Sequence, residues 1–241
     1  MTTRTVATCS VCRRQITLEL PDAHGVAGVW LRALAPALTI CDTCAAKLER
    51  RERDRERARS LVVRRARSAI PPALANVTFN RYRWPSHAQR AAEEWARGNE
   101  PLLVISGPVG TGKTWLAAAA ANLALELGHS PVWVEGLRVA APMTLGPEGR
   151  NQLAERLARP GPLIIDDIDK TGGSEWGAGQ VLAAIDTAIT HHRPLLATTN
   201  LDLVETAVRL GEPVASRLAT ARWVRLTGPD RRTAQTQEGA P

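Results

Sequence analysis

Apolar residues from position 71 onward form short runs that alternate with longer amphipathic or Ala-rich stretches. Five runs rich in Leu, Ile and Val, each near Gly or Pro, are typical of buried strands. They span Leu102–Ser106, Val132–Glu135, Leu163–Asp166, Leu195–Thr199 and Trp223–Leu226. The stretches between them predict helices at Lys113–Leu127, Asn151–Ala158, Gly177–His191 and Leu201–Val208. This alternation predicts an α/β fold in which helices cover both faces of a five-stranded parallel sheet.

The first 70 residues follow a different pattern. Residues 1–46 carry all four cysteines, and residues 47–67 hold ten Lys or Arg against four acidic residues. Pro71 and Pro72 mark the end of this charge run, because the residue before a proline disfavours the helical conformation. We therefore expect a small N-terminal module at 1–46, a charged helical linker at 47–70, the sheet domain at 71–232 and a disordered polar tail at 233–241.

The composition permits a buried core, since 44% of the 241 residues are hydrophobic and 23% are charged. These values exclude a fibrous or wholly disordered chain. Nothing near the start predicts a secretory signal, and the most apolar window, Leu116–Leu127, contains Asn122 and Glu126. We therefore expect a cytoplasmic protein without membrane association.

The formal net charge of +7 comes mostly from residues 47–67. Acidic and basic residues lie at neighbouring turns of a helix in this run, as in Glu49 and Arg53, which favours a solvated helical linker. The same surface could instead contact nucleic-acid phosphates. The two interpretations are compatible, and the sequence leaves both open.

The strongest motif is GPVGTGKT at residues 107–114, which follows one predicted strand and precedes a predicted helix. Gly110 and Gly112 let the backbone curl so that successive N–H groups face inward, and the helix N-terminus adds a positive field. In this context Lys113 would reach the β- and γ-phosphates of ATP, and Thr114 would ligate Mg²⁺. We predict that the phosphate loop is formed by Gly107, Gly110, Thr111, Gly112, Lys113 and Thr114.

Polar residues end two further strands. Asp166 would hold Mg²⁺ through water, and Asp167 would polarise the water that attacks ATP, although many related ATPases have Glu there. Asn200, which follows the strand ending at Thr199, would orient that water. The shorter side chain of Asp167 raises the expectation of slow ATP hydrolysis.

These motifs resemble those of the AAA+ class of additional-strand P-loop ATPases. The narrower resemblance is to bacterial replicative-helicase loaders of the DnaC and DnaI type and to the related transposition helper ATPases of the IstB type. It rests on Phe79 in NVTFNRY, on DDIDK with Trp176 after it, on TTNL at 198–201 and on GEPVASRL at 211–218, and it covers roughly residues 75–232. Only 15 residues follow Leu226, too few for the full C-terminal helical lid of most AAA+ proteins.

The resemblance also implies roles for two arginines. Arg217 matches a helix-borne arginine that acts on the nucleotide of a neighbouring subunit, and Arg232 or, less favourably, Arg231 matches a second nucleotide-contacting arginine near the chain end. These roles imply a homo-oligomer or an assembly templated by the helicase.

The cysteines form two pairs, Cys9 with Cys12 and Cys41 with Cys44. Two C-x-x-C pairs predict a tetrahedral, structural Zn²⁺ site of the zinc-ribbon type, and the 28 residues between the pairs imply an insertion or a small hairpin. Disulfides or a redox pair are the rival interpretation. In loaders such a module resembles the part that grips the helicase, but zinc ribbons also bind nucleic acid, and the sequence does not decide between them.

The sequence therefore predicts an ATPase with ATP, Mg²⁺ and Zn²⁺ as cofactors that loads a replicative helicase and contacts single-stranded DNA. A transposition helper ATPase is the alternative within the same class. A zinc-containing DNA-binding adaptor with negligible ATP turnover is the alternative from a different class.

Overall fold

The computed structural model describes residues 2–21, 39–81, 84–136, 138, 142–171 and 175–231. The chain divides into two compact units, residues 1–60 and 61–241. The expected tail at 233–241 lies outside the described residues.

The first unit contains an antiparallel hairpin of β1 (Thr2–Thr8) and β2 (Gln15–Pro21) and the first part of helix α2 (Asp42–Ser68). Cys9 and Cys12 lie in the turn of the hairpin, and Cys41 immediately precedes α2. The spacing of the cysteine pairs predicted an insertion or a small hairpin between them, whereas this hairpin begins before Cys9 and carries the first pair at its tip. The buried centre of the unit is small and comprises Cys9, Cys41 and Cys44 packed with Ile16.

Helix α2 confirms that the charge run is helical, and it begins earlier than the expected linker. The boundary between the two units falls within this helix, after Ser60. At its end, the Arg65 guanidinium donates to the backbone carbonyl of Ala75 and to Asn76 Oδ1, and the following turn places Pro71 before a short 3-10 helix, η1 (Pro72–Leu74).

The second unit is built on a five-stranded parallel sheet with the order β4-β5-β6-β3-β7. The strands are β3 (Leu102–Ser106), β4 (Val132–Glu135), β5 (Leu163–Asp166), β6 (Leu195–Thr199) and β7 (Arg222–Arg225). The predicted parallel sheet is confirmed, and only the last strand is displaced, by one residue. Because all strands run the same way, the ends of β3, β5 and β6 meet at one edge of the sheet.

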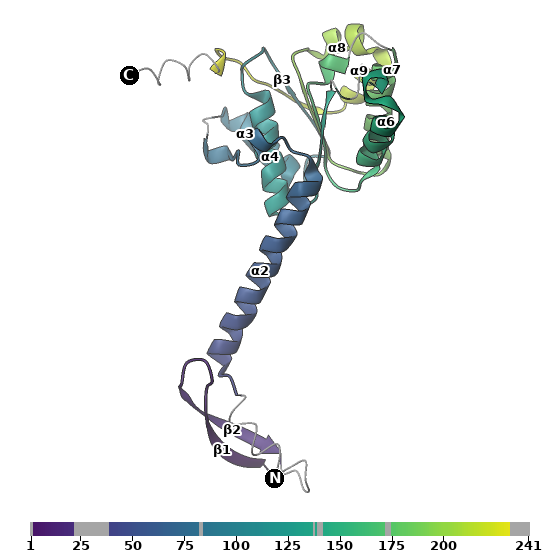
Figure 1. The fold of residues 1–241 in the computed structure, drawn as a ribbon. Coiled ribbons are helices and arrows are strands. Elements are labelled where there is room, and N and C mark those ends of the chain that lie inside the picture. Colours follow the sequence, from purple (N-terminus) through teal and green to yellow (C-terminus); the bar gives the residue numbers. More distant parts are fainter. Residues whose placement is uncertain are drawn as a thin grey trace, which may run out of the picture. The chain divides into compact units, whose positions relative to one another are not determined.

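Alternate residues of the strands face two separate cores. Leu103, Ile105 and Trp133 pack against α3 (Ser86–Ala96) and α4 (Lys113–Glu126) on one face. On the other face, strand residues such as Val104 and Ile165 pack against α6 (Pro142–Ala158), α7 (Glu175–Thr190), α8 (Leu203–Leu210) and α9 (Glu212–Leu218). Figure 1 shows these two groups of helices on opposite sides of the strands.

Helix ends differ from the predicted ones where capping chemistry intervenes. Helix α8 begins two residues later than expected, because Asp202 caps it and forms a reciprocal capping box with Glu205. Helix α6 begins earlier than expected and is kinked at Gly146, which has φ +61°. Short 3-10 helices lie at η2 (Phe79–Arg81) and η3 (Ile168–Thr171).

In the part of the chain that the structure describes, no helix combines the length and the apolar character needed to cross a bilayer.

Candidate functional site

The phosphate loop lies between the end of β3 and the start of α4. Gly110 and Gly112 have φ values of +82° and +95°, a left-handed conformation that glycine adopts without steric cost. Gly107 is required for a different reason, because a Cβ atom there would lie 2.2 Å from the Leu226 carbonyl oxygen. Thr111 stabilises the loop through a 2.9 Å hydrogen bond from its hydroxyl to the Pro108 carbonyl oxygen.

Lys113 is held inside the loop and is only 6% exposed. Its Nζ donates to the carbonyl oxygens of Gly107 at 2.8 Å and Pro108 at 2.9 Å, and to Asn200 Oδ1 at 2.8 Å. These contacts keep the ammonium charge at the mouth of the loop, where it would meet the phosphates of a nucleotide. They also join the ends of β3 and β6.

Asp166 and Thr114 form a pair of oxygen ligands suited to Mg²⁺. The Thr114 hydroxyl donates to Asp166 Oδ1 at 3.0 Å, and the Thr198 hydroxyl donates to the same oxygen at 2.7 Å. Burial raises the pKa of Asp166 to about 6, although these two hydrogen bonds act in the opposite direction. Hard oxygen donors at this spacing fit Mg²⁺, whose charge would favour the ionised carboxylate.

Replacing Asp166 with Asn is expected to stabilise the chain without nucleotide or metal. The raised pKa means that ionisation of Asp166 costs about 3 kcal/mol at most near neutral pH, so the variant should unfold several degrees higher. The folded-state pKa lies above the unfolded one. The cost is therefore fully present above about pH 6 and disappears as the pH falls toward about 4. Thermal melts at several pH values test this, and an Asp166→Asn chain less stable than wild type at neutral pH would contradict it.

Asp167 has a left-handed backbone with φ +56°, an uncommon conformation for a residue with a side chain. Its N–H donates to Thr198 Oγ1 at 2.8 Å, so one threonine hydroxyl positions both aspartates. The Asp167 carboxylate forms a close ion pair with Lys170, and this contact raises the pKa of Lys170. Thr198 lies two residues before Asn200, but the motif alone does not predict a role for it.

Asn200 is held in place by Asp169, a residue to which the sequence motifs assign no role. Its backbone N–H donates to Asp169 Oδ1 at 3.1 Å, and its Nδ2 donates to Asp169 Oδ2 at 2.8 Å. The side-chain oxygen is thereby turned toward Lys113, which donates to it. Asp169 is 7% exposed, so this carboxylate acts as a buried support for the site.

These residues border a cavity of about 320 Å³. Its lining includes six predicted site residues, which are Gly110, Gly112, Lys113, Thr114, Asp167 and Asn200. Trp84 and Arg231 close another side, with the Arg231 guanidinium 5.1 Å from the centre of the Trp84 ring. Arg232 lies outside the described residues, so the arginine that the structure places at the cavity is Arg231.

The segment after β7 crosses the phosphate loop. The Arg231 N–H donates to the Gly110 carbonyl oxygen at 3.0 Å, and a Cβ atom on Gly110 would lie 2.1 Å from the Asp230 carboxyl group. The Asp230 carboxyl therefore lies next to Gly110 of the phosphate loop.

Asp230→Asn is expected to strengthen ATP binding by about fivefold, because it removes a negative charge whose repulsion is worth about 1 kcal/mol. Isothermal titration of the variant and of Glu148→Gln, an exposed carboxylate on α6, provides the comparison. Equal ATP affinity in both variants would show that the Asp230 charge does not oppose the nucleotide.

Arg217 does not appear among the described residues that line this cavity. It lies on α9, where its Nε donates to Asp186 Oδ1 on α7 at 2.8 Å, and its side chain is 40% exposed. Arg217 is therefore not among the described residues that border the cavity of its own chain, and its role at the nucleotide of a neighbouring chain stays a prediction.

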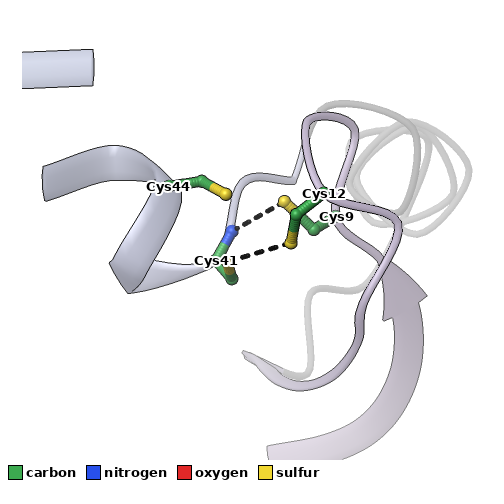
Figure 2. Close-up of side chains that lie close together, drawn as sticks. All are labelled: Cys9, Cys12, Cys41 and Cys44. Atoms are coloured by element: carbon green, nitrogen blue, oxygen red, sulfur yellow. Dashed lines mark hydrogen bonds between the residues drawn. The ribbon is translucent and has the colours of Figure 1, made fainter. Parts of the chain in front are cut away.

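The four cysteines converge in the first unit. Figure 2 shows their sulfur atoms directed toward one another, with Cys9 and Cys12 from the hairpin turn, Cys41 just before α2 and Cys44 in its first turn. All four Sγ atoms lie within 4.8 Å of one another, and none of the cysteines forms a disulfide. The Cys12 and Cys41 sulfurs are 3.6 Å apart.

The cluster fits a tetrahedral zinc ion. Thiolates about 2.3 Å from zinc place their sulfurs about 3.8 Å apart, close to the observed spacing. Backbone N–H groups of Cys12 and Cys41 donate to the Cys9 sulfur and lower its pKa to about 6, which favours the thiolate. Contacts with the Cys12 sulfur and burial raise the pKa of Cys44 to about 12, so a metal would be needed to hold all four as thiolates.

We expect one zinc ion per chain when the protein is purified without chelator. The ion should resist EDTA while the protein is folded, because four thiolates bind tightly, and a mercurial should release it. Elemental analysis before and after the reagent counts the ion, and protein without bound zinc would contradict the assignment.

Similar sequences occur among ATP-binding proteins and helicase loaders. The family described as IstB-like ATP binding protein matches residues 44–228. The replicative helicase loader DnaC of Escherichia coli strain K12 is 31% identical over 193 residues, which is 75% of this chain and 77% of that protein. A putative ATP-binding protein of insertion sequence IS1162 from Pseudomonas fluorescens is 30% identical over 101 residues, 41% of this chain and 43% of that protein.

A crystal structure of DnaI has a similar fold. It aligns with a TM-score of 0.56 and 23% sequence identity over 67% of this chain and 94% of that chain.

Proposed function

The chain belongs to the family of IstB-like ATP-binding proteins, and from this premise we propose that it is an ATP-dependent loader that delivers a replicative helicase to single-stranded DNA. The observation that carries the proposal is the extent of the similarity to DnaC, which covers 75% of this chain. We place this activity in the cytoplasm, during initiation of replication.

In the proposed reaction, the phosphate loop holds ATP by its backbone N–H groups and by Lys113. Thr114 and Asp166 would hold Mg²⁺, which supplies positive charge to the phosphates when bound. Asp167 accepts a hydrogen bond from the attacking water. Asn200, which is held by its contact with Lys113, orients this water toward the γ-phosphate. These residues favour hydrolysis mainly by position and charge. Whether ATP or ADP is bound would then control the affinity of the chain for the helicase and for DNA.

Arg217 completes the site from the neighbouring subunit in this proposal. Its position on α9, outside the cavity of its own chain, is consistent with such a contact. ATP hydrolysis would then require a homo-oligomer or an assembly on the helicase. The second arginine contact with ATP is assigned to Arg232, with Arg231 as the alternative that already borders the cavity.

The zinc module would have a structural role. Four thiolates leave no open position for water on the metal, which excludes hydrolytic chemistry there. We propose that the ion fixes the hairpin to the start of α2 and so shapes a surface that binds the helicase or nucleic acid.

A transposition helper ATPase is the second candidate. The description of the matching family and the similarity to the insertion-sequence protein of Pseudomonas fluorescens favour it. The phosphate loop and the strand-end residues would serve either function equally well, so the partner protein decides.

A zinc-containing adaptor that binds ATP without turnover is the third candidate. Two features of Asp167 favour this candidate. Its side chain is shorter than that of Glu, and its carboxylate forms an ion pair with Lys170. A steady-state phosphate-release assay separates this candidate from an ATPase, because an adaptor would bind ATP and release no phosphate.

The test of the proposed partner uses the full chain as bait. In the presence of ATP it should retain the replicative helicase from its own organism and not an insertion-sequence transposase supplied at equal concentration. Lys113→Ala serves as the control and should lose the ATP-dependent part of the binding. Selective retention of the transposase would replace the helicase-loader proposal with the second candidate.

A further inference from the structure

A second cavity of about 320 Å³ lies away from the phosphate loop, within the unit formed by residues 61–241. It is bounded by the turn after α2, by the edge strand β4 and by α6. The lining residues are Ala69, Ile70, Pro71, Pro72, Trp133, Glu135, Arg138 and Arg156.

The charged residues of this cavity leave a positive excess. Glu135 is the acidic residue among those lining it, and its Oε2 already accepts a 3.2 Å hydrogen bond from Arg138 Nε. Among the described residues, Arg156 forms no ion pair. Burial, together with the positive charges of Arg138 and Arg159, lowers the pKa of Arg156. The negative charge of Glu135 opposes this shift. One carboxylate therefore faces two guanidinium groups, and an anion in the cavity would balance the remaining positive charge.

The remaining walls are apolar. Ile70, Pro71 and Pro72 form one side, and Trp133, which is 1% exposed, forms the floor. A concave site with an apolar side and two arginines matches a group that has both a planar ring and a phosphate. Bases of a duplex are paired inside the helix and could not enter such a site, whereas an unpaired nucleotide could.

We propose that this cavity binds a nucleotide of single-stranded DNA, with its phosphate on Arg138 and Arg156 and its base against Pro71 and Pro72. The inference rests on the proposed function and assigns residues to its DNA contact. Hereafter these four residues and Trp133 are called the nucleotide cavity.

The nucleotide cavity is connected to the ATP site through β4. Glu135 lies in register with Asp166 on β5, and a Cβ atom on the following residue, Gly136, would lie 2.2 Å from the Asp167 carbonyl oxygen. The strand that borders the cavity therefore contacts the backbone of the residues assigned to Mg²⁺ and water. A movement of Asp166 or Asp167 on ATP hydrolysis would be transmitted through β4 to the DNA bound in the nucleotide cavity.

The test measures binding of a fluorescent oligothymidylate to the full chain by anisotropy at several salt concentrations. Arg138→Ala with Arg156→Ala should weaken binding by about tenfold or more and reduce the slope of log affinity against log salt by about 1. Arg209→Ala, an exposed arginine on α8, removes the same type of charge elsewhere and should have little effect. Arg156→Lys, which keeps the charge, should retain part of the affinity.

Competition identifies the ligand. Unlabelled oligothymidylate should displace the probe, whereas inorganic phosphate at the same concentration and a duplex of the same length should do so poorly. Effective displacement by phosphate or by duplex would overturn the proposal, as would equal affinity of the double variant and Arg209→Ala, or no DNA binding by wild type. ATP binding is measured on the same samples. Wild type that binds ATP but not the oligothymidylate overturns only this inference, whereas wild type that binds no ATP overturns the proposed function.

Discussion

Lys113→Ala is expected to reduce ATP affinity by about 100-fold or more. The lysine ammonium is buried and aimed at the site of the β- and γ-phosphates, and charge-assisted contacts of this kind contribute about 3 kcal/mol or more when two phosphates share them. Isothermal titration or displacement of a fluorescent ATP analogue measures the loss.

Two controls separate this effect from unfolding. Lys47→Ala removes an exposed lysine of α2 and should leave ATP affinity unchanged. The zinc content of Lys113→Ala should equal that of wild type, because the cysteine cluster belongs to the other unit. ATP affinity unchanged by loss of Lys113 would contradict the assignment of the phosphate loop.

Arg217→Ala is expected to keep ATP affinity in the isolated chain and to lose turnover by about 1,000-fold. A guanidinium supplied by a neighbouring subunit stabilises charge on the γ-phosphate during hydrolysis, and effects of about 10³ or more are typical of such arginines. Steady-state phosphate release measures the loss, with Arg209→Ala on α8 as the matched control.

A mixing experiment tests the trans role of Arg217 directly. Arg217→Ala and Lys113→Ala chains should each be inactive alone, but a mixture of the two should recover some ATPase activity. The Arg217→Ala chain supplies an intact phosphate loop, and the Lys113→Ala chain supplies an intact Arg217. If the two chains demonstrably assemble together and no activity returns, Arg217 has no trans role and is a surface residue paired with Asp186.

The strands and the phosphate loop were predictable because their signals are local. Five buried strands show as continuous apolar runs, and GPVGTGKT carries its own strand-to-helix context. The order of the strands is a tertiary property and has no such signal. Helix α3 also carries a local signal, although it was not among the predicted helices. Its buried residues repeat at helical spacing, and they are Ala88, Ala91, Ala92 and Trp95.

The support of the candidate site was much harder to predict. Thr198 and Asp169 look like an ordinary strand threonine and a turn aspartate in the sequence, and they become important only when β5 and β6 bring them to Asp166 and Asn200. The contact of Asp230 with Gly110 likewise joins residues 120 positions apart. Pairing across the sheet creates these roles, so motif spacing does not reveal them.

The cysteine module contains one feature that the sequence predicts and one that it does not. The two C-x-x-C pairs predicted that four sulfurs would converge, and they do. The position of the hairpin was not predictable from the spacing, because the antiparallel partner of β2 precedes Cys9.

Loading of the replicative helicase onto a single-stranded DNA circle tests the central claim most directly. A circle has no end over which a closed helicase ring could pass, so the ring must be placed on it. With ATP, the wild-type chain should raise the amount of helicase bound to the circle well above that seen with helicase alone, and Lys113→Ala should not. Equal helicase on the circle with wild type, with Lys113→Ala and with no added chain would contradict the account.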